Sequence, residues 1–300
     1  MKLDAIIARS RKFVQPYRVT NGKHFSLTRF APDDIGPFKK HGKDEAAALL
    51  DEGVEALSAL QELLYASDTW SVLLVFQAMD AAGKDSAIKH VMSGVNPQGC
   101  QVFSFKAPSS EELDHDFLWR CAKRLPERGR IGIFNRSYYE ELLVVRVHKE
   151  LLQRQHLPQR LVTEHIWKQR FQDVAGFERH LARSGVLVLK FFLNVSKEEQ
   201  KKRFLERLDR PEKNWKFSDA DLRERARWSS YMKAYQEAIS HTAARHAPWF
   251  VVPADHKWFT RLIVAAAIID AMGSLGLAYP TLGRSQTQML AKAKRDLQNG

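Results

Sequence analysis

Five short, continuous apolar runs recur along the chain and are separated by longer amphipathic stretches. The runs are Val72–Phe76, Val102–Phe105, Ile131–Phe134, Val186–Leu193 and Phe250–Val252. Continuous apolar runs are typical of strands buried on both faces, and helices between them indicate parallel strands. The spacing predicts helices near residues 84–93, 111–127, 138–152, 159–184, 196–208, 218–244 and 257–272. The pattern therefore predicts an α/β fold of three layers with a five-stranded parallel sheet.

The chain ends differ from this central pattern. Residues 1–42 contain three prolines and turn signals, and we expect an extended basic arm, because residues 1–24 hold six Lys or Arg and one Asp. Residues 43–66 follow helical spacing with leucines on one face, which predicts an amphipathic helix packed on the core. We expect three segments: a 1–70 extension, a 71–284 main domain and a polar 285–300 tail, loosely held.

The composition narrows the class of protein. Hydrophobic residues make up 44% and charged residues 27% of the 300, which is ordinary for a globular protein. The formal charge of +12 favours a polyanionic partner, namely nucleic acid, an anionic membrane or a phosphate-rich substrate. The alternative is a solvated basic surface without such a partner. Two cysteines cannot build a disulfide framework, and we expect Cys121 to be a small core residue. With no signal peptide and no bilayer-length apolar segment, we expect a cytoplasmic protein without membrane contact.

The strongest local motif follows the first apolar run. Small residues lead from Ala78 through Asp80, Ala81 and Ala82 to Gly83-Lys84, and a predicted helix begins there with Asp85-Ser86. A strand, a small-residue loop and a helix start in this order are typical of a P-loop, whose N–H groups and Lys bind phosphates. Ala78 and Asp85 depart from the usual Gly and Ser or Thr. Asp80 is a candidate magnesium ligand or base, although it could instead cap the helix.

A second cluster follows the third strand, at the sheet edge where parallel sheets bind ligands. It contains Asn135, Arg136, Tyr139, Glu140 and Glu141. The arginine suits phosphate. The two acids could serve the site or could be ordinary first-turn residues favoured by the helix dipole.

A third segment is a helix of mixed charge that is interrupted by a proline and followed by a basic turn. A predicted helix carries Arg207 into Arg210-Pro211, and Lys213 and Lys216 follow in the turn. This turn could be merely structural. Alternatively it is a mobile lid, at about residues 204–222, that brings positive charge over a phosphate site.

Taken in order, these motifs resemble the second family of polyphosphate kinases, over about residues 24–280. The resemblance rests on Met79–Asp85, Asn135–Glu140, the Glu206-to-Lys216 lid and Pro253–Trp258. The segments Gly94–Gly99 and Phe105–Pro108 look most like the branch that phosphorylates both AMP and ADP. The resemblance implies a thymidylate-kinase-like P-loop fold, magnesium, a polyphosphate donor, reversibility and homo-oligomers, either dimers or tetramers.

The resemblance also implies roles for individual residues. Asp80 (as the Mg²⁺ ligand), Lys84, Arg136 and Arg207 would form the transfer centre, while the loop from Ala81 to Ser86 and the lid residues Lys213 and Lys216 would bind polyphosphate. Asn135, Tyr139, Glu140 and Glu141 would border the acceptor nucleotide, which is AMP or ADP with ADP or ATP as product. Because a nucleotide phosphate is already an anion, neutralising and positioning two polyanions is the main task.

Two other functions fit parts of the pattern. An ATP-dependent nucleoside or nucleotide kinase shares the expected fold, since fold does not fix function. A P-loop nucleic-acid-binding module would use the positive charge, but the sequence has no nucleic-acid motif and no basic stretch interleaved with aromatic residues. We therefore expect no nucleic-acid partner.

Overall fold

Six strands form one sheet in the computed structural model, which describes residues 3–38 and 42–299. The strands in spatial order are β1 (Arg18–Val19), β6 (Trp249–Pro253), β5 (Val186–Asn194), β2 (Ser71–Ala78), β4 (Ile131–Asn135) and β3 (Cys100–Ser104). The five strands β2 to β6 run parallel and are those predicted from the sequence, whereas β1 is a two-residue antiparallel addition beside β6. The central strands β2 and β5 are buried along almost their whole length, as their apolar runs require.

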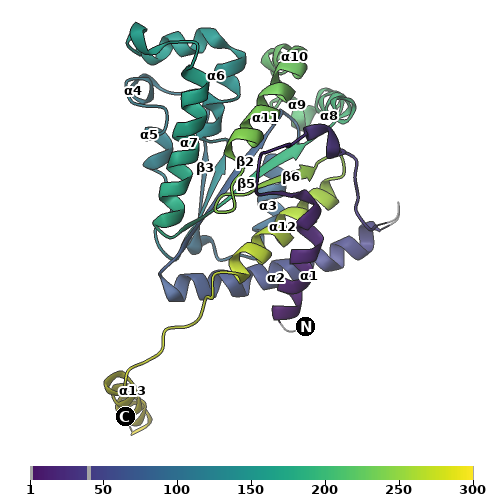
Figure 1. The fold of residues 1–300 in the computed structure, drawn as a ribbon. Coiled ribbons are helices and arrows are strands. Elements are labelled where there is room, and N and C mark those ends of the chain that lie inside the picture. The colour runs from purple at the N-terminus through teal and green to yellow at the C-terminus, as the bar shows by residue number, and fades with distance from the viewer. Residues whose placement is uncertain (1–2, 39–41, 300) are drawn as a thin grey trace.

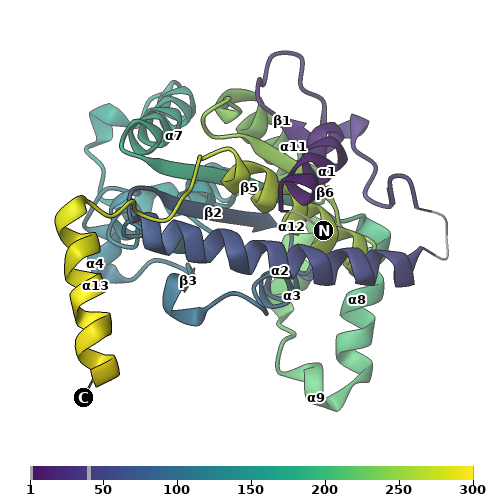
Figure 2. The same cartoon turned by 90° about the horizontal axis from the view of Figure 1, so that it is seen from below.

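Helices cover both faces of this sheet (Figure 1). On one face, α12 (Lys257–Gly273) packs against α1 (Leu3–Val14), α2 (Lys43–Ser67) and α3 (Lys84–Val91). On the other face, α7 (Ile166–Arg183) packs against α11 (Trp228–Thr242) and β5. Figure 2 shows the sheet lying between the two helical layers. The three-layer α/β fold is therefore confirmed.

The start of the chain differs from the predicted extended arm. Residues 3–14 form α1, whose buried positions Ile6, Ser10 and Val14 recur every four residues and so share one helix face. That face packs on α12, where the buried Asp270 accepts hydrogen bonds from Arg11 and Arg18. Helix α2 is present as predicted, and residues 1–2 and 39–41 of the expected extension lie outside the described residues.

Several predicted long helices are broken into shorter pieces. Residues 111–127 contain only α4 (Ser110–Leu113) and α5 (Trp119–Ala122). Residues 138–152 form the 3-10 helix η4 (Tyr138–Glu141), α6 (Val144–Val147) and the 3-10 helix η5 (Lys149–Gln155). Five side chains between positions 138 and 143 are buried, which is more than one face of a regular helix can supply. Other short 3-10 helices are η1 (Gln15–Tyr17), η2 (Leu27–Arg29), η3 (Pro97–Gly99) and η6 (Gln159–Leu161).

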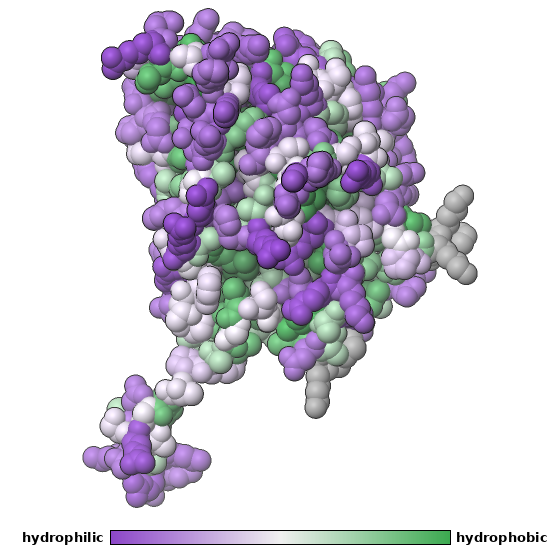
Figure 3. All heavy atoms as spheres, in the orientation of Figure 1, coloured by the Kyte–Doolittle hydropathy of each residue, from purple (hydrophilic) through white to green (hydrophobic). Residues whose placement is uncertain are grey.

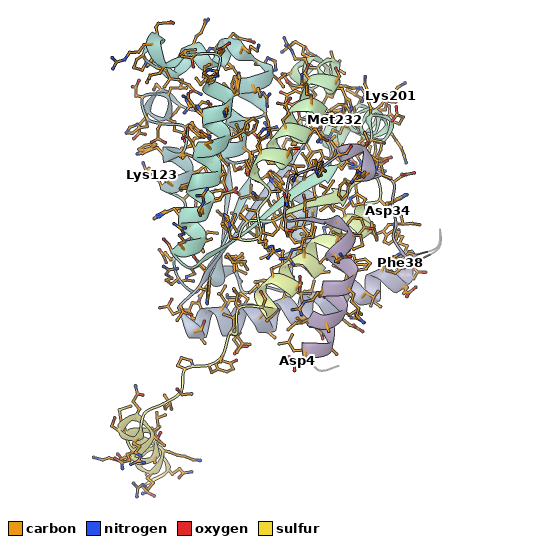
Figure 4. All side chains as sticks on the ribbon, in the orientation of Figure 1. Asp4, Asp34, Phe38, Lys123, Lys201 and Met232 are labelled. Carbon is orange, nitrogen blue, oxygen red and sulfur yellow. The ribbon has the colours of Figure 1, made fainter. Side chains whose placement is uncertain are left out.

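The segment predicted as a lid projects beside the carboxyl ends of the strands. It comprises the end of α8 (Lys197–Asp209), α9 (Pro211–Asn214) and the start of α10 (Asp219–Ala226). In Figure 4, Lys201 of α8 and Lys123 near α5 lie on opposite sides of the molecule. The face drawn in Figure 3 is largely hydrophilic.

The last segment of the chain, predicted as a loosely held polar tail, forms a helix. Helix α13 (Arg284–Asn299) has every side chain exposed and lies away from the body (Figure 1). Across residues 3–38 and 42–299, every helix is too short or too polar to cross a membrane.

Candidate active site

The loop between β2 and α3 has the geometry of a phosphate-binding loop. It leaves the sheet at Ala78 and enters α3 at Lys84, and both Ala81 and Gly83 have positive φ angles, of 59° and 105°. Glycine adopts the second angle without strain, which explains Gly83 at the helix start. Because this helix end has unpaired N–H groups and a positive dipole, the loop is suited to an anion.

Two side chains of α8 hold the outer side of this loop. Arg203 donates hydrogen bonds to the carbonyls of Ala81 (3.1 Å) and Ala82 (2.8 Å), and Gln200 donates to the carbonyl of Asp80 (2.9 Å). Arg203 also donates to the Ala254 and Asp255 carbonyls beyond β6. With its carbonyls bound on this side, the loop can present its N–H groups to a ligand on the other. Arg203 is buried, so these bonds are shielded from water.

Lys84 lies at the base of the loop. Its ammonium group donates to the Ala78 carbonyl at 3.1 Å. Burial, together with the nearby Arg136 guanidinium, lowers the pKa of Lys84 to about 8, against the opposing effect of Asp80, Glu140 and Asp85. A lysine near this pKa gains strongly from an anionic ligand, which would hold it in the charged form.

Arg136 connects the loop to the segment after β4. It has φ of 64°, an uncommon conformation for a side chain of this size. Its guanidinium pairs with Asp80 at 2.8 Å and with Glu140 at 3.3 Å. The Glu140 carboxylate raises the pKa of Arg136 above its ordinary value, so this cation stays charged at any working pH. Asn135 donates to Asp85 at 2.6 Å and so holds the start of α3 against β4.

A cavity of about 630 Å³ opens above the loop and is lined mostly by charged groups. It brings together all the residues predicted for the transfer centre and for polyphosphate, which are Asp80, Ala81, Ala82, Gly83, Lys84, Asp85, Ser86, Arg136, Arg207, Lys213 and Lys216. Asn135, predicted to border the acceptor nucleotide, also lines this cavity. Ser86 accepts a hydrogen bond from Arg261 at 3.0 Å, so α12 also supports the loop. We call this space the donor cavity.

Two of the lid cations are paired with acids that also line the donor cavity. Lys213 contacts Glu206 at 2.7 Å, and Arg207 lies 3.8 Å from Asp221 and donates to the Lys216 carbonyl at 3.3 Å. These pairs lie near solvent, where ion pairs contribute little and are easily exchanged. An anionic chain could therefore take these cations from their present partners.

A second cavity, of about 260 Å³, adjoins the first at Lys106 and Arg136. It is more enclosed by apolar atoms, including those of Phe117 and Val144, and is lined by Glu140 and Glu141. We call it the acceptor cavity. Glu141 is buried, and burial raises its pKa although Arg170 (3.1 Å) and Gln155 (2.6 Å) bind its carboxylate. Glu141 therefore lines the cavity and is also held by two side chains of the surrounding structure.

Tyr139 does not reach either cavity. Its side chain is fully buried, and its hydroxyl donates to Glu178 (2.8 Å) and contacts Thr242 (2.8 Å). The predicted contact between Tyr139 and the acceptor nucleotide is therefore not supported by its position. The neighbouring Tyr138 does line the acceptor cavity.

The acidic groups of the site fit a phosphate-bound magnesium ion better than a protein cage. No cluster of three or more His, Cys, Asp or Glu suited to a metal occurs within the described part of the chain. Asp80 and Asp85 both line the donor cavity. Mg²⁺ commonly takes one or two carboxylates, water and substrate phosphates, and these two residues fit that pattern.

Sequence reasoning missed several residues of the donor cavity. Arg203, Lys106, Lys257 and Asp221 all line it. Lys106 and Lys257 lie inside motifs that were noted for other reasons. The spacing of Arg203, four residues before Arg207, could have indicated a common helix face. Its bonds to loop carbonyls depend on tertiary packing and leave no local signal.

Comparison with known proteins agrees with this geometry. Residues 40–276 match the family described as Polyphosphate kinase 2. The chain is 51% identical over 282 residues to an ADP-polyphosphate phosphotransferase of Rhodopseudomonas palustris, a match covering 94% of this chain and 97% of the relative. It is 44% identical to an AMP/ADP-polyphosphate phosphotransferase of Meiothermus ruber, covering 89% and 96% respectively.

A solved structure is similar throughout the fold. The crystal structure of polyphosphate kinase 2 from Arthrobacter aurescens aligns with a TM-score of 0.83 at 38% identity. The alignment covers 93% of this chain and 96% of that one.

Proposed function

The chain belongs to the polyphosphate kinase 2 family, and from this premise we propose that it transfers phosphoryl groups reversibly between inorganic polyphosphate and AMP or ADP. The observation that carries the proposal is the pair of adjoining cavities. One is large, charged and covered by a basic lid, and the other is smaller and partly apolar. Arg136 lines both, at the place where a phosphoryl group would pass between them.

Polyphosphate fits the donor cavity because its charge repeats along the chain. The loop N–H groups would bind the terminal phosphate, while Lys84 and Arg136 would neutralise it from two sides. Arg207, Lys213 and Lys216 line the same cavity from the lid and would bind the next phosphates. The net charge of +12 then has a partner of opposite sign.

The nucleotide fits the acceptor cavity, whose apolar walls suit a nucleoside and whose inner end reaches Arg136. Glu140 and Glu141 would act on the acceptor through water or a cation, because direct contact between carboxylate and phosphate is repulsive. We expect Glu141→Gln to lower AMP phosphorylation more than ADP phosphorylation.

The reaction needs positioning and charge neutralisation more than base catalysis, because the attacking phosphate oxygen is already anionic. We propose direct in-line transfer, without a phosphoenzyme. Asp80, with Asp85 nearby, would hold a bound Mg²⁺, which would supply positive charge to the reacting phosphates. Lys84 and Arg136 would stabilise the charge that develops on the transferred group.

The remaining proposals concern setting and assembly. The free thiols of Cys100 and Cys121 and the use of nucleotides suit the cytoplasm. We propose a homo-oligomer, on the family resemblance. Light scattering after gel filtration would test this, and a single 34.5 kDa species would contradict it.

A direct experiment tests the proposed function. The protein is mixed with Mg²⁺ and long-chain polyphosphate, first with AMP and then with ADP, and the nucleotides are separated by chromatography. We expect ADP and ATP to form. Failure with both acceptors would contradict the proposal, whereas ATP-dependent phosphorylation of a nucleoside would favour an ordinary kinase on the same fold.

A further inference from the structure

A charged pair lies buried behind the segment that carries Arg136. Lys190 of β5 and Glu178 of α7 are almost wholly inaccessible to solvent, and their Nζ and Oε2 atoms are 2.5 Å apart. Neither residue lines the donor or the acceptor cavity. The proposed transfer reaction therefore gives this pair no direct role.

The pair is the centre of a hydrogen-bond network that ends on two consecutive tyrosines. Glu178 Oε1 accepts from the hydroxyls of Tyr138 (2.9 Å) and Tyr139 (2.8 Å). Lys190 donates to the Thr242 carbonyl (2.8 Å) and lies 3.1 Å from the Tyr139 hydroxyl. Burial, followed by the Glu178 carboxylate, raises the pKa of both tyrosines well above the ordinary value, so their hydroxyls remain neutral donors.

These tyrosines follow Arg136 in the chain by only two and three residues. Arg136 has a positive φ, and such a residue keeps that conformation only when its surroundings fix it. On the cavity side the turn is held by the Arg136 contacts to Asp80 and Glu140. On the core side the side chains of Tyr138 and Tyr139 anchor it to Glu178.

We propose that Glu178, held in place by Lys190, is a positioning residue for phosphoryl transfer: through Tyr138 and Tyr139 it fixes the turn that presents Arg136 to the transferred phosphate. This rests on the proposed function. A role in stability alone would be a weak reason for such a pair, because buried ion pairs are often no more stabilising than apolar side chains of similar volume. The pair does, however, supply what an apolar pair could not, which is a fixed acceptor for two tyrosine hydroxyls.

The test compares three variants with the wild-type protein. Glu178→Gln weakens the acceptor, and the double variant Glu178→Leu, Lys190→Met removes both charges with little change of volume. Asp270→Asn is the matched control, because Asp270 is also a buried carboxylate bonded to arginines but lies on α12, outside both cavities. For each, we measure kcat and KM for polyphosphate and ADP, the thermal midpoint, and amide hydrogen exchange of residues 135–142.

We expect Glu178→Gln and the double variant to raise exchange in residues 135–142. We also expect kcat to fall by about 10- to 100-fold with KM nearly unchanged, because small misplacement of a catalytic group has effects of this size. Asp270→Asn should lower the thermal midpoint but leave both kcat and the exchange of residues 135–142 as in the wild-type protein. If the double variant folds and keeps wild-type kcat and exchange, the pair is structural only and the proposal is overturned. Exchange measures how firmly the turn is held without reference to activity, so an inactive wild-type protein would count against the proposed function alone.

Discussion

At the scale of single residues, the charge of Lys84 depends on its surroundings. Burial and Arg136 lower its pKa to about 8, whereas the carboxylates around it act in the opposite direction. The free protein therefore loses this charge as the pH rises through about 8, far below the pH at which an exposed lysine would lose it. A bound polyanion favours the protonated form and would delay the loss.

We therefore expect kcat/KM for polyphosphate to fall as the pH rises above about 8, because this parameter reports the free enzyme. The acidity of Arg136 cannot produce this limb, because its pKa is raised. Initial rates between pH 6.5 and 9.5 at low polyphosphate would measure it. A flat profile up to pH 9.5 would mean that the charge of Lys84 is not required.

Asp80 and Asp85 differ in their partners, and this predicts different consequences. Asp80 pairs with Arg136, whereas Asp85 accepts a hydrogen bond from Asn135. The neutral Asn135 is a poorer metal ligand than a carboxylate, so it could not replace Asp80 in binding the metal. If Asp80 organises Mg²⁺, Asp80→Asn should reduce activity far more than Asp85→Asn, and added Mg²⁺ should restore part of it. A magnesium titration of both variants measures this. Equal, mild defects that Mg²⁺ does not relieve would contradict the assignment.

At the scale of elements, α8 serves both the loop and the lid. Its middle binds the loop carbonyls through Gln200 and Arg203, and its end carries Arg207 into the lid. A movement of the lid that reached Arg203 would therefore change the phosphate-binding loop as well. This coupling has no local signal in the sequence, which predicts only a helix of mixed charge before a proline.

We expect Arg203→Met to lower the free energy of unfolding by about 3–5 kcal/mol, because it leaves four buried or partly buried carbonyls and Glu199 without their partner. Urea unfolding followed by circular dichroism measures this. A change below about 1 kcal/mol would mean that water replaces the guanidinium.

The lid assignment predicts a defect confined to the donor. Lys213→Gln with Lys216→Gln should raise KM for polyphosphate more than KM for ADP, because both lysines line the donor cavity. Lys201→Gln with Lys202→Gln is the matched control. These two lysines of α8 lie outside that cavity, and their substitution removes the same amount of charge. If both double variants raise KM for polyphosphate equally, the lid lysines act only through general electrostatic attraction and not by binding the donor in the cavity.

At the scale of the whole molecule, the sequence predicted the parallel strands, the P-loop and the three-layer fold. Apolar runs and a small-residue loop ending in Gly-Lys are local signals, so they can be recognised in the sequence without knowing how the chain packs. Helix α1 was not predicted, because the three prolines among the first 42 residues, at 16, 32 and 37, favour an extended chain. Tyr139 was assigned to the acceptor because it stands in the same motif as Glu140, whereas its hydroxyl is buried in the core on Glu178.

The central claim is that inorganic polyphosphate is the phosphoryl donor. The most direct measurement uses polyphosphate labelled with ³²P, unlabelled ADP and Mg²⁺, with Lys84→Met as the inactive control. The account predicts that the label moves into the terminal phosphate of ATP in the wild-type reaction and not in the control. If ATP forms without label and with an equal amount of AMP, two ADP molecules have reacted with each other, and the claim is wrong.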